Sequence, residues 1–261
     1  MISRQDVGIT GNTGGRITET PQDQDSSCPD NGLLRFDGWK GQFVAPMHTQ
    51  QLVNKAPCFR ATLHKDGHDV QVVVKFVYHY RGTYGKVVHE YLHGLMLAPR
   101  LYSAVNLHHG LVMVVMEYLG FEAGIGGWVE LDTFEHAMGD MAASVRKKIE
   151  TIIDHLQGQE MVHADLRPKN IMIQVDAQHH IITSSNEPIL SIIDFDWAGM
   201  VDEVCYPPLL NPHIPWPTGT KAYGKVGRED DRILLNNWWD AFVQPAKQLS
   251  PKNNVYSLDS P

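Results

Sequence analysis

Cysteine is scarce in this sequence, and long apolar runs are missing. The three cysteines, Cys28, Cys58 and Cys205, are odd in number and form no CxxC pair, which disfavours a disulfide framework and a zinc knuckle. The longest apolar run near the middle, at 111–116, is too short to span a bilayer. The first ten residues lack the apolar stretch of a signal peptide. We therefore expect no membrane partner and a soluble protein of a reducing compartment, the cytoplasm or the nucleus.

Charge of one sign is not concentrated anywhere in the chain. The 22 Lys and Arg residues and 30 Asp and Glu residues give a net charge of -8. Phosphate backbones are bound by clustered Lys and Arg, so we expect no nucleic-acid partner. The 14 histidines include the pairs at 108–109 and 179–180, but neither pair has a partner at a fixed spacing. These pairs favour surface loops over a metal site.

The chain begins with a stretch that is poor in large apolar residues. Residues 1–40 are rich in Gly, Thr, Ser, Asp and Gln, which is typical of a flexible tail. The stretch GNTGGR at 11–16 resembles a phosphate loop but lacks the GK[ST] ending and a preceding strand. We interpret it as a chance match.

Strand and helix patterns follow from about residue 42. Two strands are predicted at 58–63 and 70–78, joined by a turn with Asp-Gly at its centre. The next segment, 86–97, has helical spacing of apolar residues and ends before Pro99. Further strands are predicted over the ranges 111–119, 170–175 and 189–195, and further helices over 143–157 and 230–242.

Lys75 lies in the middle of an apolar strand, which is an unusual place for a charge. Its neighbours alternate, so that Gln71, Val73 and Lys75 share one face of the strand. The simplest interpretation is an edge-strand lysine whose ammonium reaches water. The alternative is a functional lysine paired with Glu90 of the following helix, because such a pair holds a lysine toward nucleotide phosphates.

The segment VHADLRPKNIMI at 162–173 carries the densest set of polar residues. Asp165 can accept the hydrogen bond of an attacking hydroxyl, and the amide oxygen of Asn170 can coordinate Mg²⁺. Arg167, between them, can neutralise charge on a transferred phosphoryl group. His163 is expected to hold the loop through a backbone contact. Asp194 ends the later apolar strand in DFDWAG, where it either caps a turn or provides a second metal ligand.

Over about residues 50 to 200 the sequence resembles the protein-kinase-like superfamily, and most closely small, divergent kinase-like proteins of fungi. VVVK is similar to the lysine strand, HEYLHGLMLAPRL to the following helix, VVMEYL to the hinge strand, HADLRPKN to the catalytic loop, and DFD to the DFG motif. The resemblance implies an α+β, bilobal fold with a small antiparallel β N-lobe and a shortened, mainly helical C-lobe. The implied boundaries are 41–119 for the N-lobe with its hinge strand and 120–261 for the C-lobe.

The same resemblance assigns roles to individual residues. The residues implied to be catalytic are Lys75, Glu90, Asp165 and Arg167. Those implied to bind ATP are Val73, Lys75, Met116, Glu117, Leu119 and Met172, with Glu117 and Leu119 acting through their backbone. Asn170 and Asp194 are the implied Mg²⁺ ligands.

Several positions depart from the family pattern. No glycine occurs between Gly41 and Gly67, where the family has a glycine-rich loop, and the segment 53–59 is expected to replace it. Ala164 stands in place of the HRD arginine, and Asp196 in place of the DFG glycine. Asp230 or Asp231 is expected to stand in for the aspartate that anchors the catalytic loop from a later helix.

These residues favour an ATP-dependent phosphotransferase that transfers the γ-phosphoryl group to a hydroxyl. Arg167 and Pro168 favour a protein Ser/Thr substrate over a small alcohol such as an aminoglycoside or choline. A pseudokinase that acts as an interaction scaffold is the alternative from another functional class, because the glycines are missing. Paired charges inside a cleft favour activity over a scaffold role, because they are costly to bury without a function.

Overall fold

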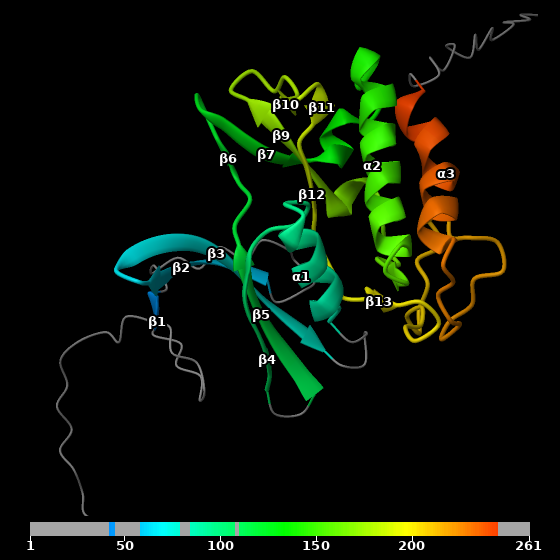
Figure 1. The fold of residues 1–261 in the computed structure, drawn as a ribbon, viewed down its shortest axis with the longest axis horizontal. Coiled ribbons are helices and arrows are strands. Elements are labelled where there is room, and N and C mark those ends of the chain that lie inside the picture. The colour runs from blue at the N-terminus through cyan, green and yellow to red at the C-terminus, as the bar shows by residue number, and fades with distance from the viewer. Residues whose placement is uncertain (1–41, 45–57, 79–83, 108–109, 245–261) are drawn as a thin grey trace, which may run out of the picture. The chain divides into compact units, whose positions relative to one another are not determined.

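A β-rich half is followed along the chain by a half in which helices and short strands are mixed (Figure 1). The computed structural model describes residues 42–44, 58–78, 84–107 and 110–244. All of them belong to one compact unit, residues 31–261. The expected tail at 1–40 and most of the segment expected to replace the glycine-rich loop lie outside the described residues.

The first sheet is antiparallel and has five strands in the order β1-β2-β3-β5-β4. Its strands are β1 (Gln42–Val44), β2 (Cys58–Lys65), β3 (His68–Tyr78), β4 (Leu101–Asn106) and β5 (Leu111–Glu117). The predicted turn joins β2 to β3: Asp66 and Gly67 have φ angles of 52° and 80°. Two consecutive positive φ values are the geometry that an Asp-Gly hairpin turn provides.

The alternation along β3 gives its two faces different surroundings. Val72 and Val74 are buried in a small core with Met113 and Val115 of β5. Lys75 points to the opposite face, because successive side chains in a strand alternate. This places the lysine ammonium on the side of the sheet that faces the second half of the chain, where its partners lie.

Helix α1 (Lys86–Gly94) packs its buried residues Val88, His89 and Leu92 toward the main core. It is shorter than the predicted range 86–97. The chain leaves the helix at Leu95, and Met96 adopts a positive φ of 59°. The turn then leads through Pro99 into β4.

The second half contains two long helices and several short strands. Its helices are α2 (Ala142–Gln157), α3 (Asp230–Val243) and the 3-10 helices η3 (Leu131–Phe134), η4 (Gly139–Met141) and η5 (Pro168–Asn170). Its strands are β6 (Phe121–Glu122), β7 (Gly126–Glu130), β8 (Met161–Val162), β9 (Ile171–Asp176), β10 (Thr183–Ser184), β11 (Glu187–Pro188), β12 (Leu190–Ile192) and β13 (Gly199–Met200). A four-stranded sheet has the order β12-β9-β7-β6, and β10-β11 and β13-β8 form two-stranded sheets.

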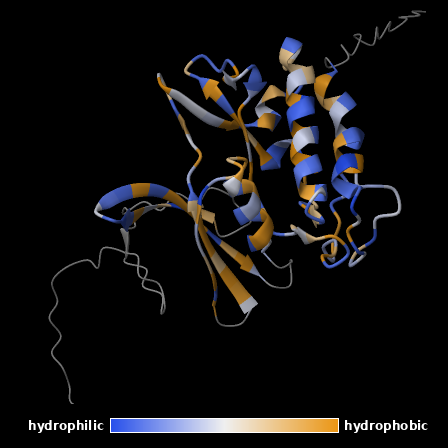
Figure 2. Ribbon diagram, viewed as in Figure 1, coloured by the Kyte–Doolittle hydropathy of each residue, from blue (hydrophilic) through white to orange (hydrophobic). Residues whose placement is uncertain are grey.

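The main hydrophobic core lies between α2, α3 and the strands β8 and β9, which flank the loop 163–170. Helix α2 buries one stripe, Val145, Ile149, Ile152, Ile153 and Leu156, as the helical spacing predicts. Figure 2 shows the same helix with hydrophilic residues over the rest of its surface. Leu166, Ile171, Ile192 and Phe195 are fully buried in the same core. The loop that begins at His163 is therefore fixed at both of its ends by packing.

The expected fold class is confirmed: the chain is α+β, with an antiparallel sheet in its first half and two long helices with short strands in its second. The chain passes from the first sheet to the second between Glu117 and Phe121. Within the described ranges, no helix is both long enough and apolar enough to cross a membrane.

Candidate functional site

A pocket of about 350 Å³ lies between the first sheet and the second half of the chain. Its lining residues are Cys58, Val73, Lys75, Pro99, Met116, Glu117, Tyr118, Leu119, Glu130, Met172, Ile193 and Asp194. All six residues that the sequence assigns to ATP binding are among them, together with one of the two assigned metal ligands. Residues from β3, β5, β9 and the segment after β12 are thus brought to one cavity, although their roles there remain predictions.

Lys75 is buried in this pocket and is bound by two carboxylates. Its Nζ donates to Asp194 Oδ1 at 2.5 Å and to Asp196 Oδ1 at 2.7 Å. Burial alone would lower the pKa of Lys75, but the two carboxylates outweigh it and raise that pKa. The lysine is therefore a fixed positive charge and not a proton donor or acceptor near neutral pH.

The predicted contact between Lys75 and Glu90 is wrong. Glu90 is about half exposed and pairs with Lys86 one turn earlier on α1, with an N–O distance of 3.6 Å. The preceding residue, His89, occupies the buried side of the helix and stacks on Phe195, with ring centroids 4.3 Å apart. Adjacent residues on a helix point about 100° apart, so Glu90 faces away when His89 faces in.

Asp194 lines the pocket, and its backbone has a positive φ of 66°. Burial would raise the pKa of Asp194, but the Lys75 ammonium beside it brings that pKa below its usual value. The carboxylate is thus kept ionised at the wall of the pocket, and its role as a metal ligand stays a prediction.

Three polar residues of the segment 162–173, Asp165, Arg167 and Asn170, contact one another. Asp165 is buried, and its Oδ1 accepts a hydrogen bond of 2.9 Å from Arg167 Nε. Asn170 Nδ2 donates to both the backbone oxygen and Oδ2 of Asp165, each at 2.8 Å. Two side chains therefore fix the orientation of one carboxylate.

Burial raises the pKa of Asp165 to about 7, although Arg167 and Asn170 favour its charged form. A carboxylate whose pKa lies near the working pH accepts a proton more readily than one with a pKa near 4. The predicted base is therefore in an environment that suits proton transfer.

Helix α3 anchors the loop that begins at His163. Asp231 accepts hydrogen bonds from the backbone amides of His163 at 2.6 Å and Ala164 at 2.9 Å. Of the two aspartates that the sequence left open, Asp231 is the anchor, whereas Asp230 accepts from Tyr206 Oη and the Gly227 amide. The His163 ring contacts Ile193 O through Nε2 at 3.0 Å, which is the predicted backbone contact.

The ligand set of Asn170 and Asp194 fits a hard divalent cation. Since Asn170 Nδ2 faces two acceptors on Asp165, its amide oxygen is the atom that Asn170 can offer to a cation. Mg²⁺ takes one or two protein oxygens and completes its octahedron with water and phosphates. Within the described ranges no group of three or more His, Cys, Asp or Glu residues could hold a metal ion.

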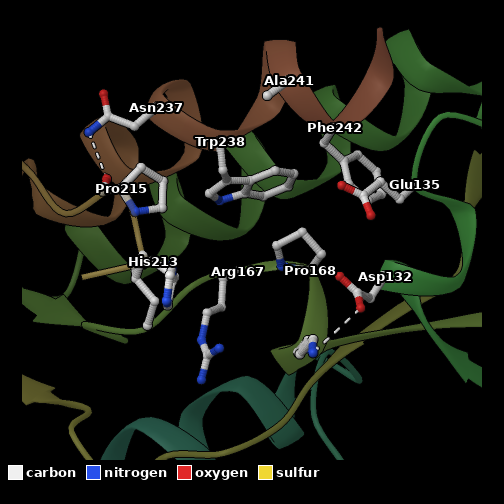
Figure 3. Close-up of a pocket in the computed structure, with 12 residues that line it drawn as sticks. Asp132, Glu135, Arg167, Pro168, His213, Pro215, Asn237, Trp238, Ala241 and Phe242 are labelled. Carbon is white, nitrogen blue, oxygen red and sulfur yellow. Dashed lines mark hydrogen bonds and ion pairs between the residues drawn. The ribbon is translucent and has the colours of Figure 1, made fainter. Parts of the chain in front are cut away.

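Arg167 borders a second pocket, of about 380 Å³ (Figure 3). Trp238, Ala241 and Phe242 of α3 form its apolar side, and Pro168 of the loop lines it as well. Its remaining lining residues are Asp132, Glu135, Arg167, Lys169, His213, Ile214, Pro215 and Asn237. Arg167 thus contacts the candidate base and also borders this second cavity.

Sequence reasoning missed this second pocket and the role of Asp196. The pocket joins α3, the 213–215 segment and the loop, which are distant in sequence, so no local pattern indicated it. For Asp196 a signal was present, because it stands next to Phe195 in DFD, where the resembling family has a glycine; its contact with Lys75 depends on the left-handed backbone at Asp194, which the sequence pattern did not indicate.

Comparisons with known proteins give little beyond the fold. No protein-family model matches the chain, and no curated protein matches it. A solved structure of the Cydia pomonella granulovirus kinase PK-1 is similar, with 15% sequence identity and a TM-score of 0.48. The match covers 71% of this chain and 64% of that chain, so this chain spans less than two thirds of the viral kinase. What this chain does is therefore inferred from its own pockets and side chains.

Proposed function

We propose that this chain is an ATP-dependent phosphotransferase that transfers the γ-phosphoryl group to a hydroxyl. The observation that carries the proposal is the linked arrangement around Asn170. This residue bonds the Asp165 carboxylate through its side chain, and its backbone oxygen accepts from the Ile193 amide at 3.0 Å, next to Asp194. Asp194 and the buried Lys75 line one pocket, and Asn170 connects the candidate base Asp165 to the segment that carries Asp194.

The pocket between the sheets is suited to the nucleotide. Its walls are apolar at Val73, Met116, Leu119 and Met172, which suits the faces of a purine, and charged at Lys75 and Asp194, which suits phosphates and a cation. Asn170 and Asp194 would hold Mg²⁺. When bound, Mg²⁺ supplies positive charge against the phosphate oxygens.

The transfer step requires a group that accepts the hydroxyl proton. The acceptor oxygen forms a bond to the γ-phosphorus, the bond to the β–γ bridging oxygen breaks, and ADP leaves with that electron pair. Asp165 accepts the proton of the hydroxyl, and Arg167 places its positive charge beside this carboxylate. Lys75 keeps its own charge throughout, because its two carboxylate partners raise its pKa.

The second pocket, which Arg167 borders, supports an acceptor site, because Arg167 also contacts the candidate base. We propose a Ser or Thr residue of a protein as the acceptor, on the basis of Arg167 and Pro168 in the loop. The aromatic and proline surface at Trp238, Phe242 and Pro168 suits an apolar side chain that flanks the hydroxyl. Small alcohols are the competing acceptors.

The test is a transfer assay with purified chain, radiolabelled ATP and Mg²⁺. Generic protein substrates and small alcohols, including choline and an aminoglycoside, are the acceptors. We expect label in the protein fraction, and we expect Asp165→Asn to lower turnover by roughly 10²-fold or more while ATP binding stays nearly intact. Label in the alcohols alone would reassign the acceptor class. Transfer no greater than that of the Asp165→Asn variant would leave the scaffold function as the better explanation.

A further inference from the structure

The acidic partners of Lys75 lie in the segment that follows β12, and not in α1. Two carboxylates reach the ammonium, but they differ in position: Asp194 lines the nucleotide pocket, whereas Asp196 is outside the set of lining residues. The Asp196 side chain is 22% exposed and the Lys75 side chain 10% exposed, so their contact is largely shielded from water. Asp196 is the residue that stands where the family has a glycine.

Helix α1 offers no acidic side chain on its buried side that could contact the Lys75 ammonium. Its first turn contains no acidic residue, and Glu90 is engaged by Lys86 on the exposed side. To take the buried position of His89, Glu90 would need a helix rotation of about 100°. That rotation would remove His89 from its stack on Phe195 and break the 2.8 Å contact between His89 Nε2 and Pro99 O.

The start of α1 is also fixed to the segment that carries the two aspartates. The Gly85 amide donates to Phe195 O at 2.8 Å. A Cβ atom at Gly85 would lie 2.5 Å from Ala198 O, closer than real Cβ contacts, so this approach is possible only for glycine. The helix and the 195–198 segment therefore hold each other in place.

We propose that Asp196 is the positioning residue that holds the Lys75 ammonium toward the nucleotide pocket, in the role that the family resemblance gives to Glu90. The inference rests on the proposed function for its catalytic consequence. A cation bound at Asp194 takes that carboxylate away from Lys75, and Asp196, which lies outside the pocket lining, remains as the lysine's counter-charge. Lysine positioning then depends on the 194–196 segment and does not require a movement of α1.

The contact is tested first in the protein without nucleotide. Unfolding in urea is measured for Lys75→Met, Asp196→Asn and the double variant, and for the matched cycle that pairs Lys75→Met with Glu90→Gln. We expect a coupling of about tenfold in the unfolding equilibrium constant for Lys75 with Asp196, equal to about 1.4 kcal/mol, and less than twofold for Lys75 with Glu90. Equal coupling in the two cycles, or coupling below twofold for Asp196, overturns the proposal.

The catalytic consequence is tested by phosphoryl transfer. Asp196→Asn should lower kcat/KM for ATP by roughly 10- to 100-fold, while Glu90→Gln should stay within twofold of the original chain. Adding Asp196→Asn to Lys75→Met should cause no further loss, because the two residues act as one unit. Asp196→Glu, which retains the carboxylate on a longer side chain, should restore part of the activity. A full additional loss in the double variant, or no recovery with glutamate, contradicts the positioning role.

Failure of the proposed function is distinguishable from failure of this inference. A chain that neither binds nor turns over ATP with Mg²⁺ overturns the proposed function and with it the catalytic role of Asp196. The urea cycles still decide, independently of nucleotide, whether Asp196 is the partner of Lys75.

Discussion

The Asp231 carboxylate accepts the His163 backbone amide at 2.6 Å and so joins α3 to the loop that carries the candidate base. Its other oxygen accepts from Ala164, whose φ of 65° lies in the left-handed region. A non-glycine residue in that region costs about 1–2 kcal/mol. The carboxylate on α3 therefore supports a backbone conformation that the sequence would not adopt by itself.

Asp231→Ala is expected to destabilise the fold, because it leaves two buried amides without an acceptor. Each such amide costs about 1–3 kcal/mol, so we expect a loss of about 2–6 kcal/mol in the free energy of unfolding. Urea denaturation provides the measurement. Asp240→Asn, at an exposed position of the same helix, is the control and should change stability by less than about 0.5 kcal/mol. A loss no larger than the control's would show that the loop does not depend on this anchor.

His89 predicts a pH dependence of stability. Burial lowers its pKa from 6.5 to about 4, although the hydrogen bond to Pro99 O opposes that shift. The unfolded chain binds the proton more tightly, so this stabilisation is fully present above pH 6.5 and is lost as the pH falls through about 4. The shift corresponds to about 3 kcal/mol.

The measurement is the free energy of unfolding of the original chain and of His89→Gln at several values between pH 7 and pH 4. Other groups titrate in both proteins over this range: His163, whose pKa is lowered by burial, loses stability in acid, whereas Asp165 and Asp231, whose pKa values are raised by burial, gain it. We expect the variant to lose about 3 kcal/mol less over this range. His68→Gln, at an exposed position of β3, should follow the original chain. Parallel curves for all three proteins would refute the role of His89.

The sequence predicted most of the candidate site because its residues lie in local motifs. Lys75 reaches the pocket through strand alternation, and Asp165 and Asn170 meet because five residues of one loop separate them. The position of Glu90 was predicted wrongly, because helical spacing shows which residues share a face of the helix but not which face turns toward Lys75. The spacing over 86–97 predicts a buried stripe of Val88, Tyr91, Leu92 and Leu95. The buried residues of α1 are instead Val88, His89 and Leu92.

The parts that could not be predicted depend on contacts distant in sequence. The stack of His89 on Phe195, which orients α1, joins residues more than a hundred positions apart in the sequence. From the sequence alone, the aspartate that anchors the loop could be either Asp230 or Asp231. One residue along a helix decides which of the two faces the loop, and the packing of Leu234, Leu235 and Trp238 sets that rotation.

Metal and nucleotide are expected to bind together, each more weakly without the other, because the protein offers only part of the coordination of Mg²⁺. A ligand that binds only the folded chain stabilises it by about 2.7 kcal/mol at a hundredfold excess over Kd. We therefore expect millimolar ATP with Mg²⁺ to raise the melting temperature by several degrees.

Asp194→Ala should abolish most of this rise, while Glu90→Gln should retain it. The loss of one buried partner also affects Lys75, so the melting temperature of each variant is compared with and without ligand. Replacement of Mg²⁺ by a chelator should weaken the shift in the original chain. A shift that does not depend on metal, or one that survives in Asp194→Ala, would contradict the assignment of Asp194 as a metal ligand.

Ala241 offers a way to test the acceptor pocket without disturbing the nucleotide pocket. It lines the cavity of Figure 3 next to Trp238 and Phe242, and it is exposed, so a larger side chain can enter the cavity without displacing the core. Ala241→Trp should fill much of the roughly 380 Å³. It lies in a different cavity from Lys75 and Asp194, so the affinity for ATP should stay unchanged.

If the acceptor binds there, Ala241→Trp should raise the KM for a protein acceptor by roughly tenfold or more, because even a small loss of apolar contact costs 1–3 kcal/mol. The control is Ile233→Trp, which places the same side chain at an exposed position of α3 outside the cavity. Initial rates at varied acceptor and at varied ATP separate the two effects. An unchanged acceptor KM in Ala241→Trp would move the acceptor site away from α3, and an equal rise in Ile233→Trp would attribute the effect to the added tryptophan itself. A selective rise would show that the face of α3 that borders Arg167 receives the group to be phosphorylated.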